Sequence, residues 1–185
     1  MTKRSPEITE KQRRFIEAQK MFFVATAPAN GHINLSPKGM DSLRILDHKR
    51  VIWLNVTGSG NETAAHVQHD PRMTLMFCAF AGDPKILRLY GNARAVHRND
   101  GDWDALYGKF PPRSGARQIF DLNVEMVQTS CGFGVPLMEY VGERGMMEAW
   151  ADKKGERGIE AYWRDRNQVS LDGVDTGILA KNLAE

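Results

Sequence analysis

Six segments bounded by turn-forming residues constrain the fold of this chain more than any other feature. Most are rich in apolar, β-branched or aromatic residues, and they stop near glycine, proline or asparagine instead of continuing with helical periodicity. They occupy residues 21–26, 32–36, 50–56, 72–80, 85–97 and 122–130. Few helical patterns lie between them, which argues for a closed antiparallel barrel and against a parallel, doubly wound sheet. The sequence therefore predicts a mainly β, α+β fold with six strands.

Helical patterns are expected at the edges of this β framework. Thr9 followed by Gln12 has the spacing of a capping box and predicts an N-terminal helix. Two short helices are expected over residues 62–68 and 100–107. Residues 143–166 alternate charged and apolar positions at helical spacing and predict two surface helices, because glycines interrupt the pattern.

Size and charge exclude several classes of protein. A chain of 185 residues suits one domain, so we expect a single domain over residues 1–185, with residues 143–185 as its helical C-terminal extension. The formal net charge of +2 gives no electrostatic argument for a nucleic-acid partner. The N-terminus lacks an apolar leader, and no segment approaches the roughly 20 apolar residues of a membrane span. Since Cys78 and Cys131 make no disulfide framework, we expect a cytoplasmic protein with reduced cysteines and no membrane partner.

Two segments carry groups suited to an anion. Ser36 and Lys38 flank a proline at a strand end, which can hold a phosphate or a flavin edge, although the segment alone favours a turn with a solvated lysine. Residues 57–63 form a glycine-bearing loop that opens a helix, where unpaired N–H groups favour negative charge. An ordinary helix N-cap explains this loop equally well. The spacing does not match a P-loop.

Two later segments carry polar groups within strands. Arg88 alternates with apolar neighbours, so it either reaches an anion or forms a structural ion pair, which the segment alone favours. Residues 127–136 crowd polar side chains at a strand end, and such side chains can hydrogen-bond a flavin edge without carrying charge. Cys131 has no neighbouring base in sequence and is interpreted as a small pocket-lining residue. The five histidines show no metal-ligand spacing.

Taken together, these segments resemble the uncharacterised bacterial branch of the pyridoxamine 5′-phosphate oxidase-like proteins. The matching motifs lie at residues 22–28, 34–39, 57–63, 76–80, 87–91 and 128–132. The resemblance covers about residues 8–165 in order and spacing. It implies an FMN-binding split β-barrel and a homodimer with two flavin sites at the interface.

The resemblance also indicates where this chain departs from the true oxidase. Lys38 keeps the lysine of a flavin-contacting segment whose leading arginine is missing. Trp53 and Leu54 replace a cofactor-contacting Tyr-Thr pair, and residues 60–63 replace a phosphate-binding Ser-Arg-Lys. A C-terminal substrate-binding Trp and Arg motif is not found. These departures argue against pyridoxamine 5′-phosphate oxidation and leave FMN as the expected cofactor.

The expected cofactor-binding residues combine this resemblance with the local chemistry. They are Ser36, Lys38, Trp53, Asn55, Ser59, Asn61, Thr63, Arg88, Gln128, Thr129 and Ser130. Lys38 and Arg88 are expected to supply positive charge to the flavin phosphate or ring. The phosphate is expected on the N–H groups of residues 59–63, with Glu62 turned toward solvent or toward a cation such as Arg44 or Arg50.

The sequence thus predicts an FMN-dependent oxidoreductase acting on an unidentified small molecule. No catalytic side chain is named, because the flavin carries the redox chemistry. Two alternatives stay open, a deazaflavin-dependent reductase of the same fold and a non-catalytic flavin or haem binder that acts as a sensor or carrier. Haem binding would require an axial histidine, and no histidine lies in the matching motifs.

Overall fold

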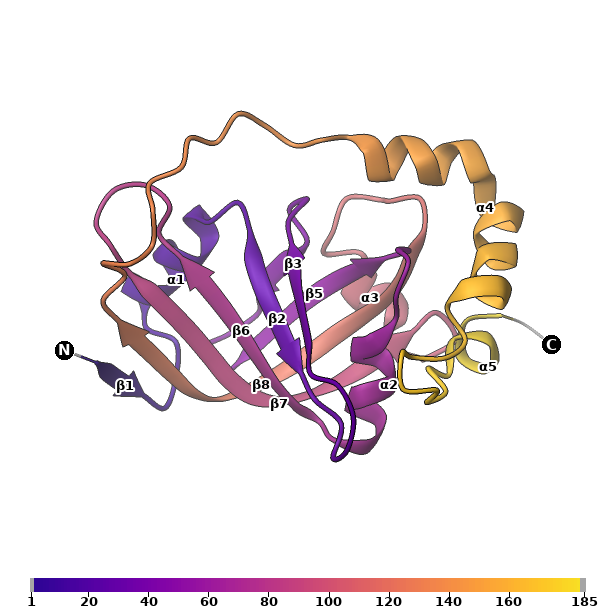
Figure 1. Cartoon of the computed structure of the whole chain (residues 1–185), viewed down its shortest axis with the longest axis horizontal. Helices are drawn as coiled ribbons and strands as arrows, with labels where there is room; N and C mark the ends of the chain where they lie inside the picture. Colours follow the sequence, from indigo (N-terminus) through magenta and orange to yellow (C-terminus); the bar gives the residue numbers. More distant parts are fainter. Residues whose placement is uncertain (1, 184–185) are drawn as a thin grey trace.

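One curved antiparallel sheet organises the computed structural model, which describes residues 2–183. Its strands are β1 (Lys3–Ser5), β2 (Phe22–Thr26), β3 (Asn34–Lys38), β4 (Leu43–Ile45), β5 (Arg50–Val56), β6 (Arg72–Cys78), β7 (Ile86–His97) and β8 (Ala116–Ser130). The order across the sheet is β3-β2-β6-β7-β8-β5-β4, with β1 paired to the end of β8 (Figure 1). Since β3 and β4 do not pair within the described residues, the sheet is a half-barrel and not the closed barrel that the strand pattern predicted.

The prediction of six strands is wrong, because the sheet has eight. All six predicted strands are present, but β1 and β4 were not predicted. Each has only three residues, too few for alternation to separate a strand from a loop. In addition, β8 begins at Ala116, six residues before its predicted start.

Helices surround the sheet at its ends and edges. They are α1 (Glu10–Ala18), α2 (Glu62–His69), α3 (Trp103–Tyr107), α4 (Met146–Arg166) and α5 (Ile178–Asn182). The capping box of Thr9 and Gln12 is confirmed, and Gln12 N–H donates to Thr9 Oγ1 over 3.3 Å. The two predicted surface helices are also present, as α4 bends at Gly155, whose φ of 63° lies outside the helical region. No helix within residues 2–183 is long and apolar enough to cross a membrane.

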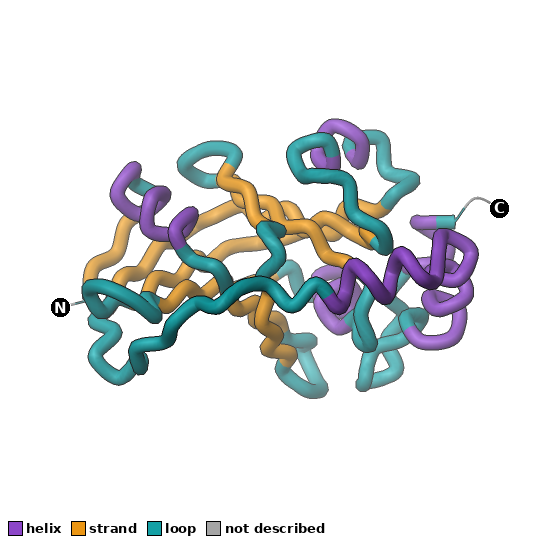
Figure 2. Tube along the Cα trace, turned by 90° about the horizontal axis from the view of Figure 1, so that it is seen from above, coloured by secondary structure: helices purple, strands orange, loops and turns teal. Residues whose placement is uncertain are grey.

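Alternation along the strands separates an inner, apolar face of the sheet from an outer face, which is half-buried at the start of β7 and packed against α3 at its end. In β7, Leu87 and Leu89 are fully buried, whereas Arg88 and Tyr90 between them are half-buried. The inner side chains of β2, β5, β6, β7 and β8 form one continuous core with Ile16 of α1. Seen from above, the strands fill the middle of the molecule, and a long loop crosses in front of them to reach α4 (Figure 2).

His97, at the end of β7, is a buried histidine whose ring has no hydrogen-bond partner among residues 2–183. Asn182 is its polar neighbour, but the Asn182 side chain bonds backbone groups of Arg98 and Arg117 instead. Burial, followed by the nearby positive charge of Lys181, lowers the pKa of His97 to about 4, and the Asp100 carboxylate opposes this shift only in part. The ring is therefore neutral in the folded protein at pH 7.

We expect His97 to make the protein sensitive to acid. The folded-state pKa lies below the value of 6.5 expected in the unfolded chain, so the unfolded chain binds the proton more readily and stability falls as the pH drops from 6.5 toward 4. At pH 4.5 the loss should be about 2–3 kcal/mol. Urea unfolding measures the free energy of unfolding at pH 7 and at pH 4.5, and the difference between the two values should be smaller in His97→Gln than in the wild-type protein. The exposed residue His69 provides the matched control, and His69→Gln should keep the wild-type difference. An unchanged acid sensitivity in His97→Gln would contradict the expectation.

Candidate functional site

A β-bulge where β5 meets β8 aims Arg117 into the polar end of the half-barrel. Asn55 pairs with Gln118 and Val56 pairs with Ala116, so Arg117 is an extra residue without a partner in β5. A bulge redirects side chains, and Arg117 lies inside the fold with a relative exposure of only 2%.

The Arg117 guanidinium is held by neutral acceptors alone. Nε donates to Gln118 Oε1 over 3.0 Å, one terminal nitrogen donates to Asn167 Oδ1 over 2.9 Å, and the other donates to the Gly60 carbonyl over 3.0 Å. Among residues 2–183, no carboxylate forms an ion pair with it. Burial lowers the pKa of Arg117 to about 9, so the group still carries its charge at neutral pH.

Four predicted site residues lie on the inner face beside this arginine. Ser36 and Lys38 project inward from β3, opposite Val24 and Phe22 of β2. Trp53 and Asn55 project inward from β5, and the Lys38 ammonium lies 5.3 Å from the centre of the Trp53 ring. Burial and the nearby charge of Arg117 lower the pKa of Lys38 to about 8.

Buried polar atoms without partners gather in the same region. Asn55 Nδ2 donates to Gln118 Oε1 over 3.0 Å. The indole nitrogen of Trp53, Gln118 Nε2 and Asn61 Oδ1 have no hydrogen-bond partner among the described residues. Buried polar groups are normally paired, so this cluster has spare capacity for a polar ligand.

The loop of residues 57–63 holds Ser59, Asn61 and Thr63 at the start of α2. Two of its carbonyls are bonded, since Asn167 Nδ2 of the C-terminal segment donates to the Gly58 carbonyl and Arg117 of β8 donates to the Gly60 carbonyl. By contrast, within residues 2–183 the backbone N–H groups of residues 59–63 donate to no acceptor. Unpaired amides at a helix N-terminus are suited to an anion.

The Glu62 carboxylate bonds the C-terminal segment and not a cation, and one of its oxygens lies 3.6 Å from a Cβ built on Gly60 of the loop. Both of its oxygens accept from the Leu171 N–H, over 3.0 and 3.1 Å. Arg44 instead pairs with Asp41, and Arg50 pairs with Asp121. Of the two expected arrangements for Glu62, the one with a cation partner is absent among the described residues, because the backbone of the C-terminal segment takes that place.

The other predicted residues lie elsewhere. Arg88, Gln128 and Ser130 share the outer face of the sheet, where Arg88 pairs with Gln128 across β7 and β8 and donates to Ser130 Oγ over 3.4 Å. Arg88 forms no ion pair among the described residues, although the segment alone favoured one. Thr129 points to the inner side and lies 3.5 Å from Gln12 Nε2 of α1. Within one chain, the predicted site residues therefore lie on two different faces of the sheet and do not form one site.

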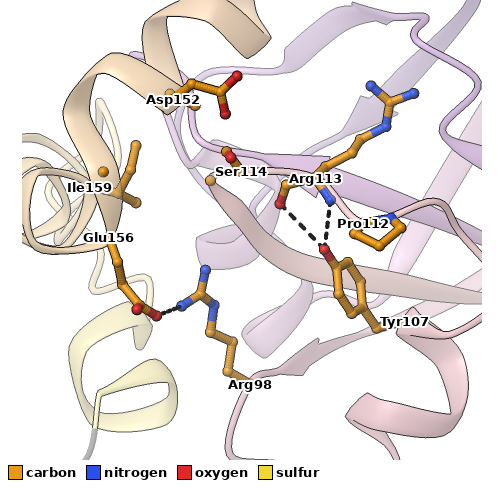
Figure 3. Close-up of a pocket in the computed structure, with 11 residues that line it drawn as sticks. Arg98, Tyr107, Pro112, Arg113, Ser114, Asp152, Glu156 and Ile159 are labelled. Carbon is orange, nitrogen blue, oxygen red and sulfur yellow. Dashed lines mark hydrogen bonds and ion pairs between the residues drawn. The ribbon is translucent and has the colours of Figure 1, made fainter.

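A cavity of about 470 Å³ lies between α4 and the loop before β8, apart from all the predicted residues. Figure 3 shows Arg98 directed at Glu156, 3.5 Å away, and the Tyr107 hydroxyl bonded to the backbone of Arg113. Arg113 also pairs with Glu148. Since both arginines already have carboxylate partners, this cavity has less capacity for an anion than the Arg117 region.

Arg117, Gln118 and Asn167 are the residues that sequence reasoning did not identify. The only local signal was a polar Arg-Gln pair ahead of the apolar Ile119 and Phe120. A bulge depends on the register of two strands, and the position of Asn167 depends on how α4 ends, so neither follows from residue order.

The comparisons with known proteins agree with this geometry. The family model described as pyridoxamine 5′-phosphate oxidase matches residues 8–131. The pyridoxamine 5′-phosphate oxidase family protein UstO of Aspergillus flavus is 38% identical, over 90% of this chain and 74% of its own length.

Two solved structures share the fold at 21% identity. A candidate pyridoxamine 5′-phosphate oxidase from Lactobacillus delbrueckii aligns with a TM-score of 0.53 over 66% of this chain and 94% of its own. A variant of HupZ from Group A Streptococcus aligns with a TM-score of 0.51 over 66% and 99%. The fold is thus the split barrel that the sequence motifs indicated. With the family model spanning most of the chain and a relative at 38% identity, this chain belongs to the pyridoxamine 5′-phosphate oxidase family.

Proposed function

We propose that this protein binds FMN and acts as an FMN-dependent oxidoreductase on a small molecule. The observation that carries the proposal is the row of unpartnered N–H groups over residues 59–63, at the start of α2. A phosphate fits there because the amides and the helix dipole both favour negative charge. Family membership supports the choice of FMN among phosphate-bearing ligands.

In this proposal the protein binds and orients the cofactor, and the bound flavin supplies hydride or electron transfer. Ser59 and Thr63 add hydroxyl donors at the phosphate, and Asn34 Nδ2 holds Thr63 Oγ1 over 3.2 Å. Asn55 and Trp53 are buried on the inner face, where they would support the site from behind. No side chain is assigned a proton-transfer role.

A homodimer follows from the division of the predicted residues between two faces. Ser36 and Lys38 face inward, whereas Arg88, Gln128 and Ser130 face outward. A single flavin can touch both groups only if one group comes from a second copy of the chain. We therefore propose that Arg88, Gln128 and Ser130 act on the flavin held by the partner subunit, with Thr129 behind them against α1.

The colour of the purified protein tests the proposal directly. A flavin absorption spectrum, with FMN identified by mass spectrometry after release, is the expected result. Bleaching under NADH or NADPH would then identify the electron donor. A Soret band, or a colourless protein that takes up no FMN on reconstitution, would contradict the proposal.

Lys38 should make FMN binding depend on pH. Its ammonium is protonated below about pH 8, so the affinity of the wild-type protein for FMN should fall as the pH rises from 7 to 9. Lys38→Met should weaken binding at pH 7 about tenfold, the size of one charge-assisted contact. The same variant should lose most of the dependence between pH 7 and 8, a range in which Arg117, with a pKa of about 9, keeps its charge. Quenching of free-flavin fluorescence measures both effects.

Lys154→Met is the matched control for this change. Lys154 also lies over an aromatic ring, 5.3 Å from the centre of Trp150, but on the exposed surface of α4. This variant should bind FMN as the wild-type protein does, with the same pH dependence. A pH dependence that survives in Lys38→Met would show that another group causes it.

A further inference from the structure

We propose that Arg117 and Asn167 are the positioning residues of the phosphate-binding loop, and that the charge of Arg117 makes the site select FMN over riboflavin. The inference rests on the proposed FMN site and goes beyond it, because it names what fixes the loop and what recognises the phosphate charge.

The first argument is the uncompensated charge of Arg117. A buried cation is costly unless an anion compensates it. Arg117 is 2% exposed, and its three recorded hydrogen bonds go to neutral oxygens. A dianionic phosphate on the neighbouring loop would supply the missing negative charge without replacing any of these bonds.

The second argument is that Arg117 holds the loop from behind. Its bond to the Gly60 carbonyl fixes the peptide plane that carries the unpartnered N–H of Asn61. The buried Asn61 side chain faces the same region, and its Oδ1 has no partner among the described residues. The amide can donate to a phosphate oxygen, whereas Asn61 Oδ1 is an acceptor and suits a hydroxyl donor of the same ligand, so both point to a polar ligand at the loop.

The third argument is that the C-terminal segment completes this support. Asn167 follows α4 directly, is fully buried, and joins Arg117 to the Gly58 carbonyl through its two side-chain atoms. Thr176 Oγ1 in turn donates to the Asn167 carbonyl over 2.6 Å. The Trp163 indole donates to Thr57 Oγ1 over 2.8 Å, so α4 is fixed to the first residue of the loop as well. The end of α4 and the residues after it are therefore part of the binding site.

Arg117 acts on the phosphate through space. The side chain is buried behind the Gly60 peptide, so its charge stabilises the dianion across a low-dielectric interior, where screening is weak. Riboflavin lacks the phosphate and gains nothing from this charge. Loss of Arg117 should therefore change the selectivity between the two flavins.

The test compares FMN and riboflavin binding in Arg117→Met, Arg117→Lys and Asn167→Ala. In Arg117→Met the affinity for FMN should fall about 30-fold or more, while riboflavin changes less than about threefold. Arg117→Lys keeps the charge but lacks the planar guanidinium, so its affinity for FMN should lie between those of Arg117→Met and the wild-type protein. Asn167→Ala keeps the charge but frees the loop, so FMN binding should weaken several-fold. Thermal unfolding of each variant reports whether it is folded.

Arg98→Met serves as the control for loss of a nearby cation. Arg98 donates to the Ala116 carbonyl beside Arg117, but it faces Trp163 and Glu156 and not the loop. This variant should keep the wild-type preference for FMN. If Arg117→Met does not fold, Arg117→Lys and Asn167→Ala decide the question with the same two ligands.

The possible outcomes separate this inference from the proposed function. A wild-type protein that fails to bind FMN overturns both. A wild-type protein that binds FMN, with variants that lose FMN and riboflavin equally or keep the wild-type preference, overturns only the role of Arg117 and Asn167. A selective loss of FMN in the variants, with Arg98→Met unaffected, supports the inference.

Discussion

Replacing Gly91 with alanine is expected to destabilise the protein by at least about 3 kcal/mol and to leave little soluble product. Gly91 lies in β7 at a shift in the register with β8. Tyr90 pairs with Met126, but Gly91, the next residue, pairs with Val124. A Cβ at this position would lie 1.9 Å from the Asn123 carbonyl oxygen, which belongs to the backbone of the central strand β8. That backbone cannot move without breaking the pairing of β7 with β8, the longest in the sheet.

Gly101→Ala is the matched control for this prediction. No atom lies within 4 Å of a Cβ built on Gly101, so the change should alter stability by less than about 0.5 kcal/mol. Urea unfolding and the yield of soluble protein distinguish the two variants. If Gly91→Ala unfolded at the wild-type urea midpoint, the expectation would be contradicted. The β8 backbone could then move at the bulge although β8 pairs with both β5 and β7.

Charges placed on the segment of residues 131–145, here called the arm, are expected to convert the proposed dimer into monomers. The arm links β8 to α4 without regular secondary structure and crosses the molecule as an extended loop (Figure 2). Its apolar side chains are poorly covered by the chain itself, and Val141 is 96% exposed. Single exposed apolar residues are common, but a series of them on one segment marks a surface for association. The series comprises Phe133, Leu137, Met138, Tyr140 and Val141.

The double variant Leu137→Asp, Val141→Asp should therefore weaken dimerisation by more than about 100-fold, because two charges would be buried without partners. FMN affinity should fall in parallel, since the proposed site uses outer-face residues of the partner subunit. Sedimentation measures the first effect and flavin fluorescence the second. Val169→Asp makes the same change at an exposed apolar residue outside the arm and should stay dimeric. A wild-type monomer that binds FMN tightly would contradict the two-chain site.

Local sequence was sufficient wherever a short-range rule decides the structure. The capping box of α1, the bend of α4 at Gly155 and the six longer strands follow from neighbouring residues alone. The same rules missed β1 and β4, because three-residue strands exist only through their pairing with β8 and β5. They also gave six strands in a closed barrel, since closure depends on whether the edge strands meet, which no local pattern encodes.

For the site, the sequence by itself left an anion site and an ordinary helix N-cap equally open for the loop at residues 57–63, because its glycines and its position before α2 suit both. The tertiary structure decided which groups surround the loop. Arg117 enters the interior only because β5 and β8 pair with a bulge, and Glu62 has a backbone partner only because Leu171 lies within its reach. Both depend on contacts between residues more than 50 positions apart. The free energy of such contacts comes from burial and pairing in the assembled fold, and residue order alone does not reveal it.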